Sequence, residues 1–193
     1  TLFRSVYYQI SRGVDPIRSH MYEEDISIET FGYVLPHSFK SKNLKVMLCK
    51  DLRWQRCDIK STSLLGNVMT MNSAKEKGCD EVIMHKNNII TEGGASNVFF
   101  SDDDCVFTPK LSKNILPGIT RELLIKEITA KGIKVKEGSY NADDLLSAKS
   151  IWLTSSTKGL AQVVEIVNQK TNLEIDHKLF EECNNIFTSN FLS

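Results

Sequence analysis

Two stretches, Asp51–Ser61 (DLRWQRCDIKS) and Thr91–Phe100 (TEGGASNVFF), decide the fold and the chemistry that this chain suits. Lys60 lies near the end of the first stretch, after strand-like residues and ahead of a helical pattern. Glu92 lies in the second stretch, ahead of a turn made of small residues. A lysine amine can hold an aldehyde cofactor as a Schiff base while an acid elsewhere tunes the cofactor ring. Lys60 and Glu92 are therefore the candidate catalytic residues.

A third stretch, Leu116–Arg121 (LPGITR), leads into a predicted helix at Thr120–Lys131, for which Thr120 is the expected N-cap. Unpaired backbone N–H groups and the helix dipole favour an anion at such an end, although most capped helices bind nothing. The hydroxyl run Thr154–Thr157 (TSST) is a weaker candidate, because runs of this kind are usually plain loops. Together these segments predict a site for a phosphate.

The order of these motifs resembles that of the fold-type IV (class IV) pyridoxal-phosphate aminotransferases, and most closely that of the D-amino acid (D-alanine) aminotransferases. The likeness covers almost the whole chain. An unrelated α+β domain would have to carry several motifs in the same order by chance, which argues against that alternative. It implies an α+β large domain in which mixed sheets form a pseudo-barrel with flanking helices. A remnant of a small α/β domain would precede it.

The resemblance also implies a role for each motif residue. Lys60 would carry pyridoxal 5′-phosphate and move the proton at the substrate α-carbon, and Glu92 would keep the ring nitrogen protonated. The implied cofactor-binding residues are Arg53, Leu116, Gly118, Ile119, Thr120, Ser155 and Ser156, and among them Arg53 would contact the phosphate. The implied substrate-binding residues are Arg18 and His20, a guanidinium and an imidazole that suit an α-carboxylate.

The chain departs from the family pattern at three places. Gly94-Ala95 stands where the D-amino acid enzymes often carry serines, and the segment from Arg12 to Arg18 is one residue longer than the common spacing. A tyrosine that faces the lysine in the family belongs to a part of the small domain that precedes this sequence. We therefore expect weak or absent turnover for this chain, while cofactor binding could survive.

The reaction implied by the resemblance moves an amino group from a D-amino acid, such as D-alanine, to a 2-oxo acid, in a cytoplasmic homodimer. Three alternatives stay open: an aminodeoxychorismate lyase, a branched-chain L-amino acid transaminase, and a truncated, non-catalytic relative that binds the cofactor. The Arg18 and His20 pair favours the D-amino acid branch.

The composition excludes several other classes of protein. The 193 residues include 24 basic and 24 acidic ones, so nucleic acid is not an expected partner. No apolar run approaches the length of a membrane span. The five cysteines form no C-x-x-C pair and the four histidines have no H-x-x-x-H spacing. We expect reduced cytosolic thiols and no metal site.

We expect a remnant of the small domain at 1–36, a linker at 37–43 and the large domain at 44–193. Strands are predicted at Leu2–Gly13, Asp25–Val34, Leu44–Lys50, Glu81–His85, Ser96–Phe100, Cys105–Thr108, Lys134–Gly138, Ile151–Thr154 and Val163–Val167. Helices are predicted at Ser63–Lys77, Thr120–Lys131, after Asn141, and at Asp176–Leu192. These elements alternate without a regular βαβ rhythm, which favours a mixed α+β domain.

Overall fold

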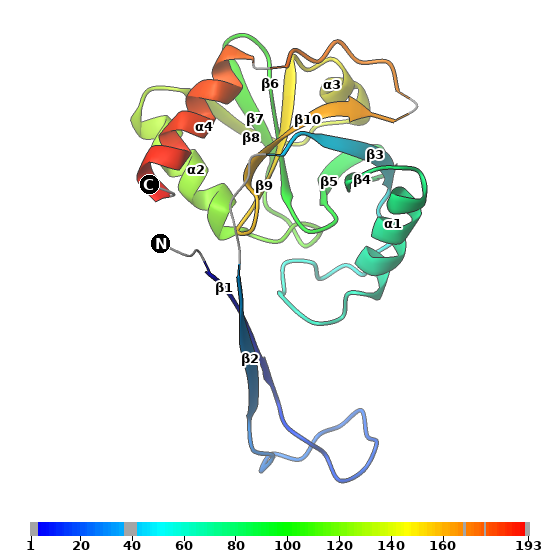
Figure 1. Cartoon of the computed structure of the whole chain (residues 1–193). Coiled ribbons are helices and arrows are strands. Elements are labelled where there is room, and N and C mark those ends of the chain that lie inside the picture. The colour runs from blue at the N-terminus through cyan, green and yellow to red at the C-terminus, as the bar shows by residue number, and fades with distance from the viewer. Residues whose placement is uncertain (1–3, 37–41, 168, 176, 192–193) are drawn as a thin grey trace. The chain divides into compact units, whose positions relative to one another are not determined.

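The computed structural model describes residues 4–36, 42–167, 169–175 and 177–191 (Figure 1). The chain divides into two compact units, Thr1–Lys40 and Ser41–Ser193. The boundary between them falls inside the linker expected at 37–43, of which residues 37–41 lie outside the described part of the chain.

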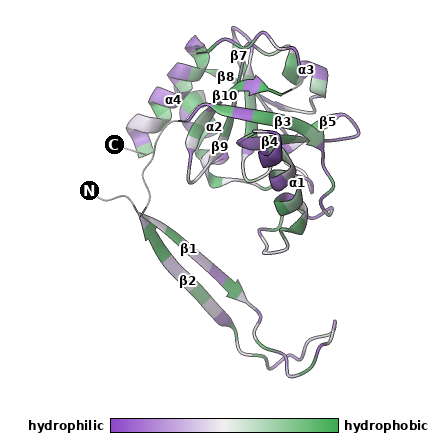
Figure 2. Ribbon diagram, turned by 45° about the vertical axis from the view of Figure 1, so that its right-hand side comes forward, coloured by the Kyte–Doolittle hydropathy of each residue, from purple (hydrophilic) through white to green (hydrophobic). Residues whose placement is uncertain are grey.

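The first unit is an antiparallel hairpin of β1 (Arg4–Ser11) and β2 (Glu29–Pro36). Both strands carry hydrophobic residues (Figure 2), and the side chains of these residues are exposed. Tyr7 and Tyr33 face each other across the hairpin and stack with ring centroids 5.1 Å apart. A two-stranded ribbon has no interior, so cross-strand pairs of this kind supply its packing.

The second unit is built on a mixed eight-stranded sheet in the order β5-β4-β3-β10-β9-β6-β7-β8. Its strands are β3 (Leu44–Lys50), β4 (Glu81–Lys86), β5 (Ile89–Gly93), β6 (Asn97–Ser101), β7 (Cys105–Pro109), β8 (Lys134–Gly138), β9 (Ser150–Ser155) and β10 (Gly159–Ile166). The pairs β10–β3, β3–β4 and β7–β8 are parallel, and the other neighbours are antiparallel. This mixture confirms the α+β class.

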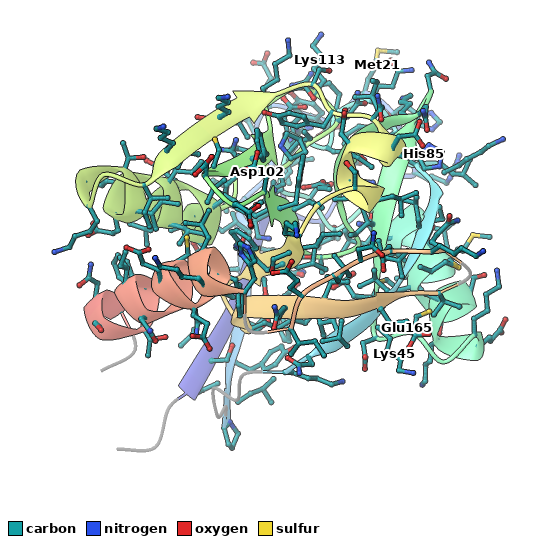
Figure 3. The ribbon with its side chains drawn as sticks, turned by 90° about the horizontal axis from the view of Figure 1, so that it is seen from above. Met21, Lys45, His85, Asp102, Lys113 and Glu165 are labelled. Atoms are coloured by element: carbon teal, nitrogen blue, oxygen red, sulfur yellow. The ribbon has the colours of Figure 1, made fainter. Side chains whose placement is uncertain are left out.

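Parallel strands far apart in sequence meet at the centre of this sheet. Lys45 on β3 and Glu165 on β10 lie close together there, with Nζ and Oε2 2.7 Å apart (Figure 3). Both side chains are about half exposed, so the pair marks the strand register and contributes little stability.

The sheet curls, because its edge strand β5 also contacts β6 and β7. Past the end of β8, the backbone N–H of Ile90 donates to the carbonyl of Tyr140 (2.8 Å), and Ile89 pairs with Asn141. The half-barrel encloses one apolar cluster whose fully buried members include Val46, Ile83, Leu145, Ile151 and Leu153. The curl brings the turns of different hairpins toward one another.

Four helices flank the sheet: α1 (Leu65–Glu76), α2 (Ile119–Ala130), α3 (Ala142–Leu146) and α4 (Lys178–Phe191). Helices α2 and α4 contact each other and both pack on β9 (Figure 1). Leu124 and Phe180 belong there to a second cluster with Phe99 and Trp152, whose rings stack 5.9 Å apart. The described residues include no helix long and apolar enough to span a membrane.

Most predicted elements are confirmed, including the Asn141 cap of α3, where Asn141 and Asp144 form a capping box. Strand β5 was not predicted, because Ile89–Gly93 was interpreted partly as a turn. Strand β10 begins at Gly159, earlier than expected, since this glycine has a φ of 61° and closes the hairpin with β9. Strand β2 begins only at Glu29.

Apolar residues recur at helical spacing along α1 and just before it, but of these only Met71 packs against a buried cluster, that of Ala74 and Val82. Leu64, Leu65 and Val68 are exposed, Met71 is half-buried, and Ala74 is the buried residue of the helix. Leu64, Val68 and Met71 line a cavity instead. The helical spacing was therefore interpreted correctly as one face, but that face borders an open space.

Candidate active site

A cavity of about 780 Å³ opens in the second unit, between α1, the N-terminus of α2, the β5–β6 turn and the β9–β10 turn. All the predicted site residues of this unit line it: Arg53, Lys60, Glu92, Leu116, Gly118, Ile119, Thr120, Ser155 and Ser156. They come from four separate segments of the chain, so the fold brings together residues that are far apart in the sequence. A cavity of this size suits a small organic ligand.

Glu92 lies near the end of β5 and is 5% exposed. Its Oε1 accepts from Arg53 Nη1 (2.6 Å), and its Oε2 accepts from the backbone N–H of Leu116 (3.0 Å) and from Asn97 Nδ2 (3.2 Å). Asn97, which the sequence did not single out, also donates to the Leu116 carbonyl (2.9 Å). The carboxylate is thus held in one orientation from both sides.

Gly118 makes this arrangement possible by its close approach to Asn97. A Cβ placed on Gly118 would lie 2.2 Å from Asn97 Oδ1, closer than any side-chain contact allows. A larger residue here would displace the amide that orients Glu92.

Arg53 lies beneath Glu92, with its side chain 6% exposed. It makes two contacts with Asp51, Nε–Oδ1 at 2.9 Å and Nη2–Oδ2 at 2.8 Å, and it also donates to the Asn114 carbonyl (3.1 Å). The resemblance assigned Arg53 to the cofactor phosphate, but these contacts commit its guanidinium to two carboxylates. Its position favours a different role, which is to orient Glu92.

Burial and these contacts together shift the pKa values of Glu92 and Asp51 in opposite directions. Burial raises the pKa of Glu92 to about 7, against the opposing effect of the Arg53 hydrogen bond and charge. Burial also acts to raise the pKa of Asp51, but the hydrogen bonds and the charge of Arg53 outweigh it and hold that pKa below its usual value. Asp51 is therefore the carboxyl group that stays ionised beside Arg53, while Glu92 titrates near neutral pH.

The raised pKa of Glu92 predicts a pH-dependent stability. Between the ordinary pKa of 4.5 and the folded value of about 7, the folded chain keeps a proton that the unfolded chain has released. The free energy of unfolding should therefore fall as the pH rises through this range, by roughly 3 kcal/mol in total. Glu92→Gln cannot titrate, so urea unfolding across this range should show the fall in the unmodified chain and not in the variant. Parallel pH profiles for the two would contradict the prediction.

Lys60 lies in the loop between β3 and α1 and is exposed at the cavity. No described residue forms an ion pair or a hydrogen bond with its ammonium group. Ile59 and Leu64 beside it are also largely exposed. The amine is therefore accessible from the cavity and not engaged elsewhere.

Helix α2 points its N-terminus at the cavity, but not in the way the sequence predicted. The helix begins at Ile119 with Gly118 as its N-cap, so the expectation that Thr120 caps it was wrong. Gly118 has no side chain, and no cap hydrogen bond satisfies the first N–H groups. Thr120 lies within the first turn and is buried. The end of α2 thus offers backbone donors without a competing cap, which suits an anion.

The hydroxyl run forms the turn between β9 and β10. Ser155 is half-buried and its Oγ accepts from the backbone N–H of Lys158 (3.2 Å), while Ser156 is exposed. Thr154 and Ser96 also line the cavity, and their hydroxyl groups are buried without a hydrogen-bond partner among the described residues. Buried polar atoms of this kind ordinarily have a partner, so a bound molecule would complete them.

The two predicted substrate residues lie in the first unit. Arg18 and His20 occupy the loop between β1 and β2, and both are exposed. Ser19 Oγ accepts from the backbone N–H of Met21 (3.0 Å) and shapes the loop around them. Their role toward a substrate stays a prediction.

Comparison with known proteins places this geometry in a family. Residues 3–166 match the family model described as amino-transferase class IV. The chain belongs to the class IV aminotransferases. Over 168 residues it is 33% identical to a D-alanine aminotransferase from Listeria monocytogenes serotype 4b, an alignment that covers 84% of this chain and 58% of that protein. The chain thus spans somewhat more than half the length of this curated relative.

Solved structures confirm the fold-type IV architecture. An aminotransferase from Brucella abortus bound to the co-factor PLP superposes with a TM-score of 0.83 at 16% identity, over 98% of this chain and 69% of that one. A branched-chain aminotransferase from Thermoproteus uzoniensis gives a TM-score of 0.79 at 20% identity, over 97% and 66%. At these identities the likeness shows the fold alone.

Class IV aminotransferases use pyridoxal 5′-phosphate, and the cavity residues fit this group. Lys60 offers a free amine for the aldehyde, Glu92 a buried carboxyl group for the ring nitrogen, and the uncapped end of α2 offers donors for the phosphate. The unpartnered hydroxyls of Ser96 and Thr154 provide further polar contacts. Among the described residues no cluster of His, Cys, Asp and Glu could hold a metal ion.

Proposed function

We propose that this protein is a pyridoxal-phosphate-dependent transaminase that moves an amino group from a D-amino acid, such as D-alanine, to a 2-oxo acid. One observation carries the proposal: Lys60, whose amine has no partner among the described residues, and the buried carboxyl group of Glu92 line the same cavity as a helix end without a side-chain cap. The 33% identity with a D-alanine aminotransferase supports the D-amino acid as the substrate class.

Pyridoxal phosphate, when bound, supplies an aldehyde that condenses with amines and an electron-withdrawing ring. Lys60 would hold the cofactor by its Nζ atom. Once the substrate amine replaces it on the aldehyde carbon, the released amine would move a proton to and from the substrate α-carbon, which its exposed position at the cavity allows. Glu92 holds the proton at the ring nitrogen, and a carboxyl group with a pKa of about 7 is suited to sharing one near neutral pH.

Other residues would hold Glu92, the cofactor and the substrate in place. Arg53 and Asn97 fix the two oxygens of Glu92, so its carboxylate keeps one direction. The backbone N–H groups at Ile119 and Thr120, with the hydroxyls of Ser155 and Ser156, would bind the phosphate, and Leu116 would contact the ring. Arg18 and His20 bind the substrate carboxylate, a role supported by their residue types and by the family resemblance.

We also propose that the protein acts as a homodimer. Trp54, Ile59, Leu64, Val68 and Ile119 line the cavity and yet expose much of their apolar surface. Exposed apolar patches of this kind mark sites of association. Sedimentation equilibrium tests this proposal, since a mass of one chain at all concentrations would contradict it.

The function is tested by the products formed from matched substrates. The chain with pyridoxal phosphate is incubated with 2-oxoglutarate and either D-alanine, L-alanine or L-leucine, and chiral chromatography identifies the glutamate formed. We expect D-glutamate from D-alanine only. L-glutamate from L-leucine would favour a branched-chain transaminase, and pyruvate release from aminodeoxychorismate without an acceptor would favour the lyase. Cofactor binding without any product would indicate a non-catalytic relative.

A further inference from the structure

Two turns that face the cavity come from different parts of the sheet. One turn joins β5 to β6 and contains Gly94; the other joins β9 to β10 and contains Ser155 and Lys158. Under the proposed function, the first turn follows the carboxyl group for the cofactor ring and the second supplies hydroxyls for the phosphate. A ligand that reaches both needs the distance between them to be fixed.

One buried carboxylate contacts both turns. Glu81, at the start of β4, has no exposed surface. Its Oε1 accepts from the backbone N–H of Gly94 (3.0 Å), and its Oε2 is 2.7 Å from Lys158 Nζ. A buried Glu81 carboxylate without a cation would be costly. The ion pair with Glu81 therefore holds the Lys158 ammonium in place.

Both backbone polar groups of Gly94 are hydrogen-bonded. While its N–H binds Glu81, its carbonyl accepts from Asn67 Nδ2 on α1 (2.7 Å). A Cβ on Gly94 would lie 2.8 Å from Glu81 Oε1 and 2.4 Å from Met71 Sδ, so only glycine lets the turn come this close. The turn after Glu92 is therefore tied directly to the Glu81 carboxylate.

Lys158 is tied to the other turn through its own backbone. Its N–H donates to Ser155 Oγ (3.2 Å), while its Nζ pairs with Glu81. The side chain is 32% exposed, and neither Lys158 nor Glu81 lines the cavity. The path from Gly94 through Glu81 and Lys158 to Ser155 thus consists of direct contacts and lies behind the cavity wall.

We propose that Glu81 and Lys158 are positioning residues that fix the spacing between the ring end and the phosphate end of the cofactor site. The inference rests on the proposed function. Its consequence is specific: the pair matters for a ligand that occupies both ends together and not for a ligand that occupies one end.

The test compares three probes: pyridoxal phosphate, pyridoxal without the phosphate, and inorganic phosphate. Glu81→Gln with Lys158→Met removes the link between the turns, while the glutamine oxygen can still accept from Gly94. We expect the Kd of pyridoxal phosphate to rise roughly tenfold, a typical loss for an orienting residue. The Kd values of pyridoxal and of inorganic phosphate should change by no more than about twofold. Each of these ligands occupies only one end of the site, so it gains nothing from a fixed distance between the two ends. Lys158→Arg should keep the affinity of the unmodified chain.

A matched control removes a Lys–Glu pair of the same length away from the cavity. Lys45→Met with Glu165→Gln cuts the exposed 2.7 Å pair labelled in Figure 3 and should change no Kd. Equal weakening of all three probes in the Glu81/Lys158 variant, or no weakening of any, would overturn the inference.

If the unmodified chain itself binds no pyridoxal phosphate, the proposed function fails, which is a distinct result. Hydrogen exchange at the Gly94 amide, compared between the unmodified chain and Lys158→Met without cofactor, then still tests the contact itself, and unchanged exchange would contradict it.

Discussion

Arg53→Met should lower the free energy of unfolding of the second unit by roughly 3–5 kcal/mol, the usual cost of removing one partner from a buried ion pair. The guanidinium has 6% exposure and binds both Asp51 and Glu92, so its loss leaves carboxyl groups in the interior without their cation. Urea unfolding near neutral pH measures the change. The loss of Arg53 should also loosen Glu92 and so weaken binding of pyridoxal phosphate.

The pH dependence of this effect distinguishes it from a loss of packing. Arg53 holds the pKa of Asp51 below its usual value, so this stabilisation is present above pH 3.8 and is lost as the pH falls through the folded pKa. The difference between Arg53→Met and the unmodified chain should therefore shrink in acid. Arg56→Met is the matched control, since Arg56 pairs with Asp58 at the surface and should show no measurable change. A constant difference at all pH values would contradict the electrostatic account.

Lys60→Ala should abolish the proposed reaction without affecting the fold. The residue is exposed and forms no ion pair with the described residues, so the urea midpoint should not change. Any pyruvate formation from D-alanine that the unmodified chain shows should fall by at least roughly 10³-fold, because the variant loses both covalent attachment and a positioned acid–base group. Lys110→Ala, at an exposed lysine outside the cavity, is the control and should keep the original rate. Comparable rates for Lys60→Ala and the unmodified chain would exclude Lys60 as the catalytic lysine.

The sequence motifs identified residues that line the cavity, because the residues of one motif are close in the sequence and lie in one turn or loop of the fold. Lys60, Glu92 and Gly118 were found this way, and all three line one cavity. Local patterns could also predict the Asn141 cap, since a capping box depends on residues three positions apart.

What the sequence could not show depends on contacts between distant segments. Arg53 was assigned to the phosphate by its place in the motif, but the curl of the sheet places it against Glu92, thirty-nine positions away. The tie from Glu81 to Lys158 spans seventy-seven positions, and nothing local to either residue indicates it. The apolar spacing in Ser63–Lys77 predicted the helix, yet only the tertiary arrangement decides whether its apolar residues face the core or a cavity.

The measurement that tests the central claim most directly is covalent trapping of the cofactor on the intact chain. The chain is incubated with pyridoxal phosphate and reduced with borohydride, its intact mass is determined, and the modified peptide is mapped. We predict one phosphopyridoxyl group per chain, on Lys60, and no site-specific adduct in Lys60→Ala. A single adduct on another lysine, or an unmodified Lys60 at saturating cofactor, would contradict the assignment of the cavity as a cofactor site.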